Sequence, residues 1–250
     1  MHANIEYKEQ NFSVNFSKPL DISIPMYSGE QNPNAFGIQH PTFEPFRAGG
    51  FVGSVALGGS VNCENLTINA HGNGTHTECV GHISKQRITI NEVLKQFMFL
   101  AQVITVTPQP INNDFVVMLK DVEPFLHPLI DALIIRTLPN ENNKLVAHYS
   151  GNNPGYLQPE LCRFLRESGI KHLIIDLPSV DREEDGGALE AHHAFWNYPD
   201  APRLDATITE MAYIPNHIED DIYVLNLQIA SLQTDASPSK PVLYKLEHVL

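Results

Sequence analysis

The segment that decides the fold is residues 159–176, PELCRFLRESGIKHLIID, which predicts a helix followed directly by a strand. From Pro159 to Ser168 the apolar residues share one helical face, and Gly169 is typical of a helix end. His172–Asp176 is an aliphatic run that ends in a carboxylate, a common position for functional groups in α/β sheets. The segment therefore indicates an α/β protein.

The flanking sequence extends this pattern on both sides. Thr89 and Glu92 fit a capping box, so we expect a helix over Asn91–Phe97. The other expected elements are a short helix at Asp121–Leu126 and strands at Ala101–Thr107, Asp131–Thr137, Ile208–Ile214 and Ile222–Ile229. Because helices alternate with strands only in the middle of the chain, a mixed sheet is favoured over a doubly wound one.

The N-terminal third is irregular and rich in glycine and proline. Residues 28–45 predict a long loop, which is either a substrate lid or an exposed wrap without a role. Short strands are expected on either side of it, at Ser13–Phe16, Leu20–Pro25, Phe51–Leu57 and Asn65–Ala70. No linker or repeat interrupts the sequence, so we expect one domain over residues 1–250.

Composition narrows the range of partners. The formal net charge of -13 disfavours nucleic acid and anionic membranes, both of which require a basic surface. There is no apolar run of membrane-spanning length, and residues 1–10 lack the pattern of a secretory signal. Three widely spaced cysteines argue against a disulfide framework. We therefore expect a cytoplasmic protein that acts on a small molecule.

Residues 71–82, HGNGTHTECVGH, concentrate metal-binding side chains. They hold three of the chain's 12 histidines and one carboxylate, the usual ligands of zinc, manganese or iron. On an extended segment His76, Glu78 and His82 share a face, whereas His71 falls on the opposite one. A bulge at the intervening glycines would restore the aim of His71.

A second cluster follows about 110 residues later, with His192 and His193 in one segment and Glu210 on an expected strand. This separation suits a site formed by tertiary contact. We expect His193 to face solvent or to pack. By strand alternation Cys79 points away from His76 and is expected to be a small buried residue. Asp176 and Asp181 either cap turns or support the site.

The ordered set of motifs resembles the metal-dependent cyclase family, which includes bacterial kynurenine formamidases and isatin hydrolases. Residues 71–82 are similar to its H-x-G-T-H-x-D-x-P-x-H signature. Five further segments resemble family motifs in order: Leu20–Pro25 ("DLS-P"), Ala132–Thr137 ("LLIRT"), Ile175–Asp181 ("GIDTPSVD"), Ala191–Trp196 with Glu210 (the late ligands) and Asp235–Pro238 ("DGSP").

The resemblance implies a single α/β domain with a central mixed, partly barrel-like sheet and a few helices, assembled as a homodimer or larger. It also implies a metal site for one or two ions, zinc or manganese. The matching metal ligands are His76, Glu78, His192 and Glu210, with His71 as a first ligand shifted by one residue. The matching general acid/base is His82.

Three departures bear on the site. The family aspartate is Glu78, whose extra methylene moves the carboxylate outward by about 1.5 Å. Gly72 aligns with the first family histidine, and Val80 replaces the signature proline. These changes leave open whether one metal or two is bound.

The leading hypothesis is a metal-dependent hydrolase of a C–N amide bond, either an aryl formamide such as N-formylkynurenine or a cyclic amide. No Gly-x-Ser-x-Gly motif is present, which disfavours a serine hydrolase. Two alternatives remain: a non-catalytic metal- or ligand-binding protein on the same scaffold, and a polyketide-type cyclase or dehydratase.

Overall fold

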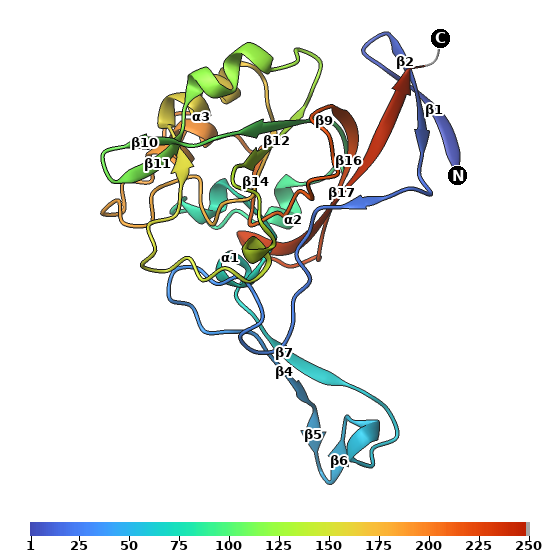
Figure 1. The fold of residues 1–250 in the computed structure, drawn as a ribbon. Coiled ribbons are helices and arrows are strands. Elements are labelled where there is room, and N and C mark those ends of the chain that lie inside the picture. Colours follow the sequence, from blue (N-terminus) through green and yellow to red (C-terminus); the bar gives the residue numbers. More distant parts are fainter. Residues whose placement is uncertain (249–250) are drawn as a thin grey trace.

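The computed structural model describes residues 1–248, and seven of its strands form a closed, mixed sheet (Figure 1). Around the closed sheet the order is β17–β16–β9–β12–β14–β15–β8, and β8 pairs again with β17. These strands are β8 (His76–Cys79), β9 (Met98–Val106), β12 (Ala132–Thr137), β14 (His172–Ile175), β15 (Thr207–Glu210), β16 (Ile222–Ile229) and β17 (Ala236–His248). The predicted α/β fold with a mixed, barrel-like sheet is confirmed.

Parallel and antiparallel pairs occupy different parts of this sheet. The strands β9, β12, β14 and β15 run parallel to one another. The strands β8, β16 and β17 are joined by antiparallel pairing, which also links β15 to β8 and β16 to β9. Helices lie between some of these parallel strands in the sequence, because two parallel strands can be joined only by a segment that crosses back over the sheet.

The α-helices are α1 (Ala70–Asn73), α2 (Ile90–Val93), α3 (Pro159–Glu167) and α4 (Glu190–Trp196). The helices α3 and α4 cover one face of the sheet, whereas α2 packs on the other. On β12, Leu133 and Ile135 pack with Leu161 of α3, whereas the alternate residues Ala132 and Ile134 belong to a second apolar cluster on the other face. Both faces of β12 are therefore buried, which explains its continuous apolar run.

Several expected elements are confirmed and others differ in extent. The helix at 159–168 and the strands at 131–137, 172–176 and 222–229 form as predicted to within a residue or two. The helix expected at 91–97 already ends at Val93. The strand expected over 208–214 ends at Glu210, because Met211 adopts a left-handed backbone (φ +50°).

Other short elements were placed less accurately. The region 121–126 contains two 3-10 turns, η3 (Leu119–Asp121) and η4 (Glu123–Phe125). The region 51–57 splits into β6 (Phe51–Val52) and the 3-10 turn η1 (Val55–Leu57). Two further turns are η2 (Val80–His82) and η5 (Asn142–Val146). These segments are too short to show the hydrophobic periodicity from which helices and strands are predicted.

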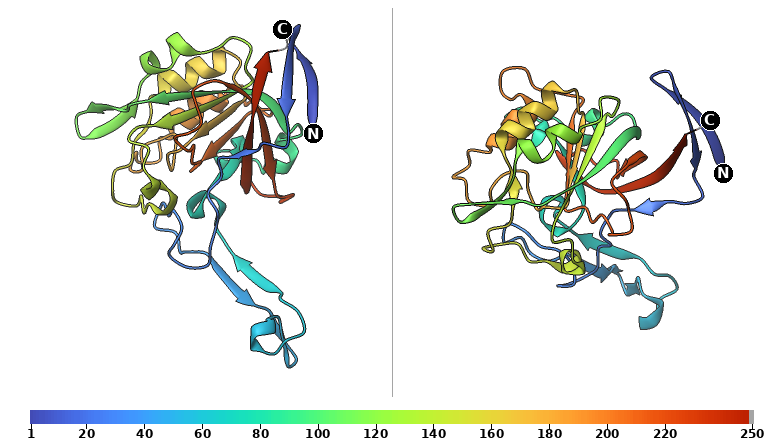
Figure 2. Two further views of the ribbon diagram at one scale, coloured as in Figure 1. Left: turned by 45° about the vertical axis from the view of Figure 1, so that its right-hand side comes forward. Right: turned by 45° about the horizontal axis from the view of Figure 1, so that its top comes forward.

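Peripheral strands extend the molecule in two directions (Figures 1 and 2). The hairpin of β1 (His2–Tyr7) and β2 (Gln10–Asn15) continues the sheet at the end of β17, and β3 (Leu20–Asp21) also pairs with β17. A two-stranded arm of β4 (Thr42–Pro45) and β7 (Glu64–Thr67) projects from the body and ends in β5 (Arg47–Ala48) and β6. A small sheet comprises β10 (Gln109–Ile111), β11 (Asp114–Val117) and β13 (Tyr156–Leu157). In the part of the chain from 1 to 248, no helix has the length and apolarity to cross a membrane.

Candidate metal centre

Strand β8 sets the geometry of the site. His76 and Glu78 alternate to the same face of this strand, as predicted, and both side chains are buried. The antiparallel register with β15 places Glu210 directly opposite His76 and Ile208 opposite Glu78. Because Ile208 packs in the apolar cluster that contains Trp196, this face looks toward α4.

His71 reaches the same centre from the short helix α1. Asn69 caps this helix by accepting a hydrogen bond from the His71 backbone N–H at 3.0 Å. Gly74 (φ +156°) then ends it, and the chain enters β8. The predicted strand bulge is therefore wrong: a helical turn, rather than an extra strand residue, directs His71 inward. A Cβ at Gly72 would lie 2.6 Å from Ile38 Cδ1 and 3.0 Å from the Ala35 carbonyl oxygen, so an alanine here would require these neighbours to shift.

His192 lies on α4, which Asp181 holds in place. One Asp181 oxygen accepts a hydrogen bond from the Ala191 N–H (2.7 Å), and the other lies 3.1 Å from the His192 backbone N and 2.6 Å from its ring Nδ1. Asp181 thus caps the helix and orients the imidazole. The structure shows that it supports the candidate ligand His192.

The five candidate ligands converge. His192 Nε2 lies 3.0 Å from Glu78 Oε1 and 3.9 Å from Glu210 Oε1. His76 Nε2 lies 3.4 Å from Glu210 Oε2, and His71 Nδ1 lies 3.1 Å from Glu78 Oε2. Tertiary folding therefore brings together the two sequence clusters.

Each histidine presents one nitrogen to this centre and the other to an acceptor. His76 Nδ1 lies 3.0 Å from the Gly74 carbonyl, which can only accept, so the Nε2 lone pair is directed inward. His192 has the same arrangement with Asp181, and His71 has it with Asp235, 2.8 Å from its Nε2. Metal-ligating histidines characteristically donate their second N–H in this way.

Two of the buried polar atoms at this centre have no hydrogen-bond partner among the described residues. His76 Nε2 and Glu78 Oε2 have no hydrogen bond of acceptable geometry, although both lie beside potential partners. An unpaired buried polar group is costly, and a cation between these atoms would satisfy both. The donor set fits a divalent metal: neutral nitrogen and carboxylate oxygen, with the atoms of His71, His76 and Glu78 all within 4.8 Å of one another.

The protonation of the site supports the same conclusion. Burial opposes charging of His71 and His192, but hydrogen bonds to neighbouring carboxylates outweigh it and raise the pKa of each imidazole to about 10. Burial also opposes ionisation of Glu78, yet the adjacent histidines, with His82 foremost, hold its pKa well below the usual range. The centre therefore favours positive charge, which a metal ion would supply in place of these protons.

His82 lies at the edge of the cluster. It is the last residue of the tight turn η2, and its side chain is 31% exposed. Its Nδ1 lies 3.8 Å from Glu78 Oε2 and 3.3 Å from Asp235 Oδ2, and its ring lies 5.5 Å from that of His192. His82 therefore lies close to the candidate metal ligands, but its side chain is more exposed to solvent than theirs.

Asp235 is a site residue that the sequence reasoning missed. Its Oδ2 contacts both His71 and His82. The sequence signal for Asp235 is that it begins the Asp235–Pro238 segment, which resembles a family motif but does not indicate which side chains the acid contacts. By contrast, His193 points to the Tyr198 carbonyl, Asp176 binds Lys144, and Cys79 is buried in the apolar core, so none of these three joins the centre.

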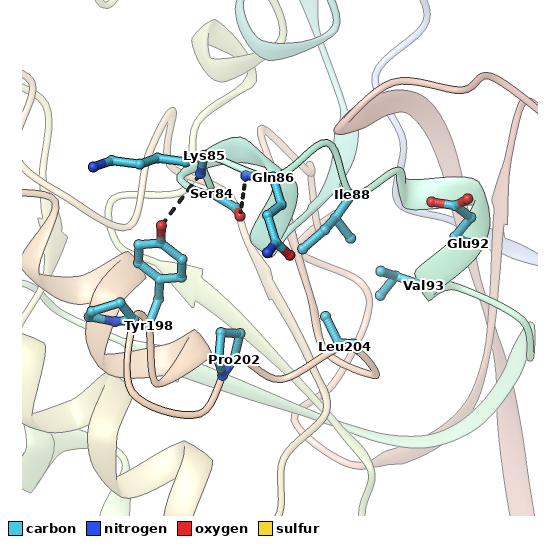
Figure 3. A pocket seen from close by; sticks show the side chains of 10 residues that line it. Ser84, Lys85, Gln86, Ile88, Glu92, Val93, Tyr198, Pro202 and Leu204 are labelled. Atoms are coloured by element: carbon cyan, nitrogen blue, oxygen red, sulfur yellow. Dashed lines mark hydrogen bonds between the residues drawn. The ribbon is translucent and has the colours of Figure 1, made fainter.

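A cavity of about 350 Å³ opens beside the cluster, within the size range of small-molecule sites. His71, His82, His192 and Glu210 line one side, and Phe36, Ile38 and Leu189 supply an apolar side. A larger cavity of about 670 Å³ lies elsewhere, between the 84–93 segment and the loop after α4 (Figure 3). Lys85, Tyr198, Pro202 and Leu204 line it, and it contains none of the clustered histidines or glutamates. The chemistry therefore belongs to the smaller cavity.

The closed mixed sheet and its buried histidine–carboxylate cluster together place this protein in the class of candidate metalloproteins. A family model described as "Putative cyclase" matches residues 14–182, more than half of the chain. The chain belongs to this cyclase family. The matched range ends before His192 and Glu210, whose position in the site follows from the structure.

Relatives and solved structures agree with this assignment. Kynurenine formamidase from Bacillus cereus (strain ATCC 10987) is 25% identical over 235 residues, which cover 92% of this chain and 96% of that protein. Isatin hydrolase A from Labrenzia aggregata has a TM-score of 0.68 at 13% identity, covering 92% of this chain and 94% of that one. A "predicted metal-dependent hydrolase" from Bacillus stearothermophilus has a TM-score of 0.66 at 17% identity, covering 91% and 98%. The structural likenesses establish a shared fold.

Proposed function

We propose that the protein is a metal-dependent hydrolase that cleaves a C–N amide bond of a small molecule. One observation carries this proposal: three histidines present one nitrogen each to a common centre, with their second nitrogens held by acceptors. The cavity beside that centre gives a substrate access to it. The relatives named above, a kynurenine formamidase and an isatin hydrolase, support an amide as the substrate.

We assign the metal ligands as His71, His76, Glu78, His192 and Glu210. A bound divalent ion would lower the pKa of water toward 7 and so supply a nucleophile at neutral pH. The mixed nitrogen and oxygen donors suit zinc or manganese. Glu78 offers one oxygen toward His71 and the other toward His192, which suits either one ion or a carboxylate shared by two.

His82 is the proposed general acid/base. Its Nδ1 is directed at Asp235, so Nε2 is the atom that accepts the proton of the attacking water. The same atom then delivers that proton to the leaving nitrogen as the C–N bond breaks. With an aryl formamide, one water is consumed and formate and the aryl amine are released.

The apolar side of the cavity suits an aromatic substrate. Phe36 and Leu189 both line it and both adopt left-handed backbone conformations, with φ of +60° and +46°. Such conformations are unfavourable for bulky side chains and often occur at functional sites. Glu183 and Asp185 also line the cavity, so we place a flat aryl group against Phe36 and Leu189, with its amide toward His82.

The test is hydrolysis of N-formylkynurenine and of isatin by the purified chain with zinc or manganese added. The proposal predicts turnover that disappears with a chelator and returns with metal, with a product heavier than a cyclic substrate by one water. Metal binding without turnover across a panel of amides would favour the non-catalytic alternative. A product formed by loss of water would favour a cyclase or dehydratase.

We also propose that the chain forms a homo-oligomer through its projecting arm. Leu57 (59% exposed) and Leu66 (60% exposed) are among the apolar side chains that the arm leaves uncovered. An isolated two-stranded hairpin is marginally stable in water, and a second copy of the chain would cover it. Light scattering should give a dimer or larger, and Leu57→Ser with Leu66→Ser should shift it toward the monomer. A monomeric unaltered chain would contradict this.

The proposed compartment is the cytoplasm. Cys63, Cys79 and Cys162 are all free thiols in the structure, and two of them are buried. Free thiols are usual where the cell keeps cysteines reduced. A thiol titration of the denatured protein, isolated without reductant, should find all three free.

A further inference from the structure

Asp235 sits at a junction between the candidate ligands and the rest of the fold. Its backbone carbonyl accepts a hydrogen bond from the Cys79 N–H at 3.0 Å. The next residue, Ala236, is paired with Glu78 in the register of β17 and β8. The main chain at Asp235 and Ala236 is therefore held against the strand that carries His76 and Glu78. The Asp235 carboxylate is presented to the site from a bend directly before β17.

A single oxygen of this carboxylate contacts two histidines with different proposed roles. Asp235 Oδ2 lies 2.8 Å from His71 Nε2 and 3.3 Å from His82 Nδ1. The two imidazole rings lie 4.4 Å apart, tilted by 31°. A carboxylate oxygen has two lone pairs, so it can accept both N–H bonds at once. The geometry suits an acceptor shared by both rings.

The opposite nitrogens of both rings are thereby left free. For His71, donation from Nε2 leaves the lone pair on Nδ1, the atom that lies 3.1 Å from Glu78 Oε2 at the centre of the cluster. For His82, donation from Nδ1 leaves the lone pair on Nε2, as a general base requires. The carboxylate fixes the tautomer and the direction of each ring.

We propose that Asp235 is a positioning residue that couples the metal site to proton transfer, acting on metal affinity through His71 and on turnover through His82. This inference rests on the proposed function. It extends that function, because one acidic side chain that is neither a proposed metal ligand nor the general base would control both the metal site and the proton transfer. Asp235 contacts the His71 nitrogen opposite to the one that faces Glu78, and we therefore assign it as a support of His71 and not as a ligand.

The first measurement is metal affinity, by competition with a chromophoric chelator, in the unaltered chain, Asp235→Asn, and the exposed control Asp200→Asn. We expect Asp235→Asn to bind zinc about 10- to 100-fold more weakly, the range found when such supporting partners are removed. Asp200→Asn should match the unaltered chain. Circular dichroism should give the same spectrum for all three proteins, because the hydrogen bonds of the Asp235 side chain run to these two histidines and not to the backbone of the fold.

The second measurement separates positioning from a general structural role. With metal saturating, Asp235→Asn should lower kcat, and the same substitution in a His82→Ala background should cause little further loss, because residues that act as a unit are non-additive. Nitrogen NMR of labelled histidine should show His82 protonated at Nδ1 in the unaltered chain and a mixture of tautomers in Asp235→Asn. Asp235→Glu, which keeps the carboxylate, should recover part of both properties.

The outcomes are separable. If the unaltered chain neither binds metal nor hydrolyses an amide, the proposed function fails. If it does both while Asp235→Asn keeps its metal affinity and its His82 tautomer, only the role of Asp235 is overturned. Additive losses with His82→Ala would also overturn it. So would a metal-bound structure with an Asp235 oxygen within about 2.0–2.2 Å of the ion, which would make it a ligand.

Discussion

His192 Nε2 lies 3.0 Å from Glu78 Oε1, although the two residues are 114 positions apart in the sequence. The contact joins the helix α4 to the strand β8 across the interior of the protein. Both side chains are almost fully buried, at 3% and 1% exposure. Burying a carboxylate at such a point is unfavourable unless charge compensates it, which is the physical basis for a cation site here.

Glu78→Ala should abolish stoichiometric metal binding. The substitution removes the carboxylate that faces both His71 and His192, and with it the negative charge that a cation at this centre would require. Elemental analysis after dialysis against zinc would measure the loss. Glu78→Asp keeps the charge but shortens the side chain, so we expect it to retain metal with altered affinity. Glu64→Ala, an exposed glutamate on the arm, is the control, and full occupancy in Glu78→Ala would refute the ligand assignment.

His82→Ala should keep the metal and lose most of the turnover. His82 lies at the edge of the cluster, whereas the proposed ligands His76 and His192 are buried, so the metal site should persist without it. Removing a general acid/base typically lowers kcat by about 10²–10⁴-fold. N-formylkynurenine hydrolysis together with elemental analysis would measure both effects. Unchanged kcat in this variant would remove His82 from the mechanism.

Gly81→Ala should destabilise the fold and disturb His82. A Cβ at Gly81 would lie 1.9 Å from the Ile88 carbonyl oxygen, so the backbone must shift, and the next residue is His82. Overpacking of this kind costs about 1–3 kcal/mol. Urea unfolding and kcat of the metal-saturated protein would report the two effects. Gly155→Ala, where the nearest atom would be 3.1 Å away, is a milder control. Unfolding free energies equal to that of the unaltered chain would contradict the prediction.

His172 should cause the free energy of unfolding to decrease at acidic pH. Burial lowers the pKa of this histidine to about 3. Below pH 6.5 the unfolded chain therefore binds a proton that the folded chain does not, and stability falls as the pH decreases from about 6.5 toward 3. In His172→Gln the free energy of unfolding should decrease less as the pH falls. Its slope against pH should be smaller than that of the unaltered chain by about 1.4 kcal/mol per pH unit. His217→Gln, at an exposed position, is the control. Identical slopes for His172→Gln and the unaltered chain would exclude this role.

The fold was predictable where hydrophobic periodicity is long. The amphipathic run of α3 and the aliphatic runs of β12, β14 and β16 all appear in the structure close to their expected bounds. Closure of the sheet was not visible in periodicity, because it depends on β8 pairing with β17 at a separation of about 160 residues. That expectation came from the family resemblance alone. The short helix α4 was also missed, since its seven residues follow an irregular loop.

The residues that form the site could be predicted from the sequence, but the hydrogen-bond acceptors that hold them in place could not. Residue types and spacing identified His76 and Glu78, and resemblance placed His192 and Glu210 beside them. The route by which His71 reaches the centre was mispredicted, because a strand pattern does not reveal a one-turn helix ended by Gly74. The acceptors behind the histidines, such as Asp235, depend on tertiary contacts that no local pattern encodes.

The most direct test of the central claim is a crystal structure of the chain soaked with zinc, with anomalous scattering recorded at the zinc edge. We predict an anomalous peak within about 2.0–2.2 Å of His76 Nε2 and of a Glu78 oxygen, with His192 or Glu210 completing the shell. A peak elsewhere at full occupancy, or no peak between these four side chains at saturating zinc, would contradict the account.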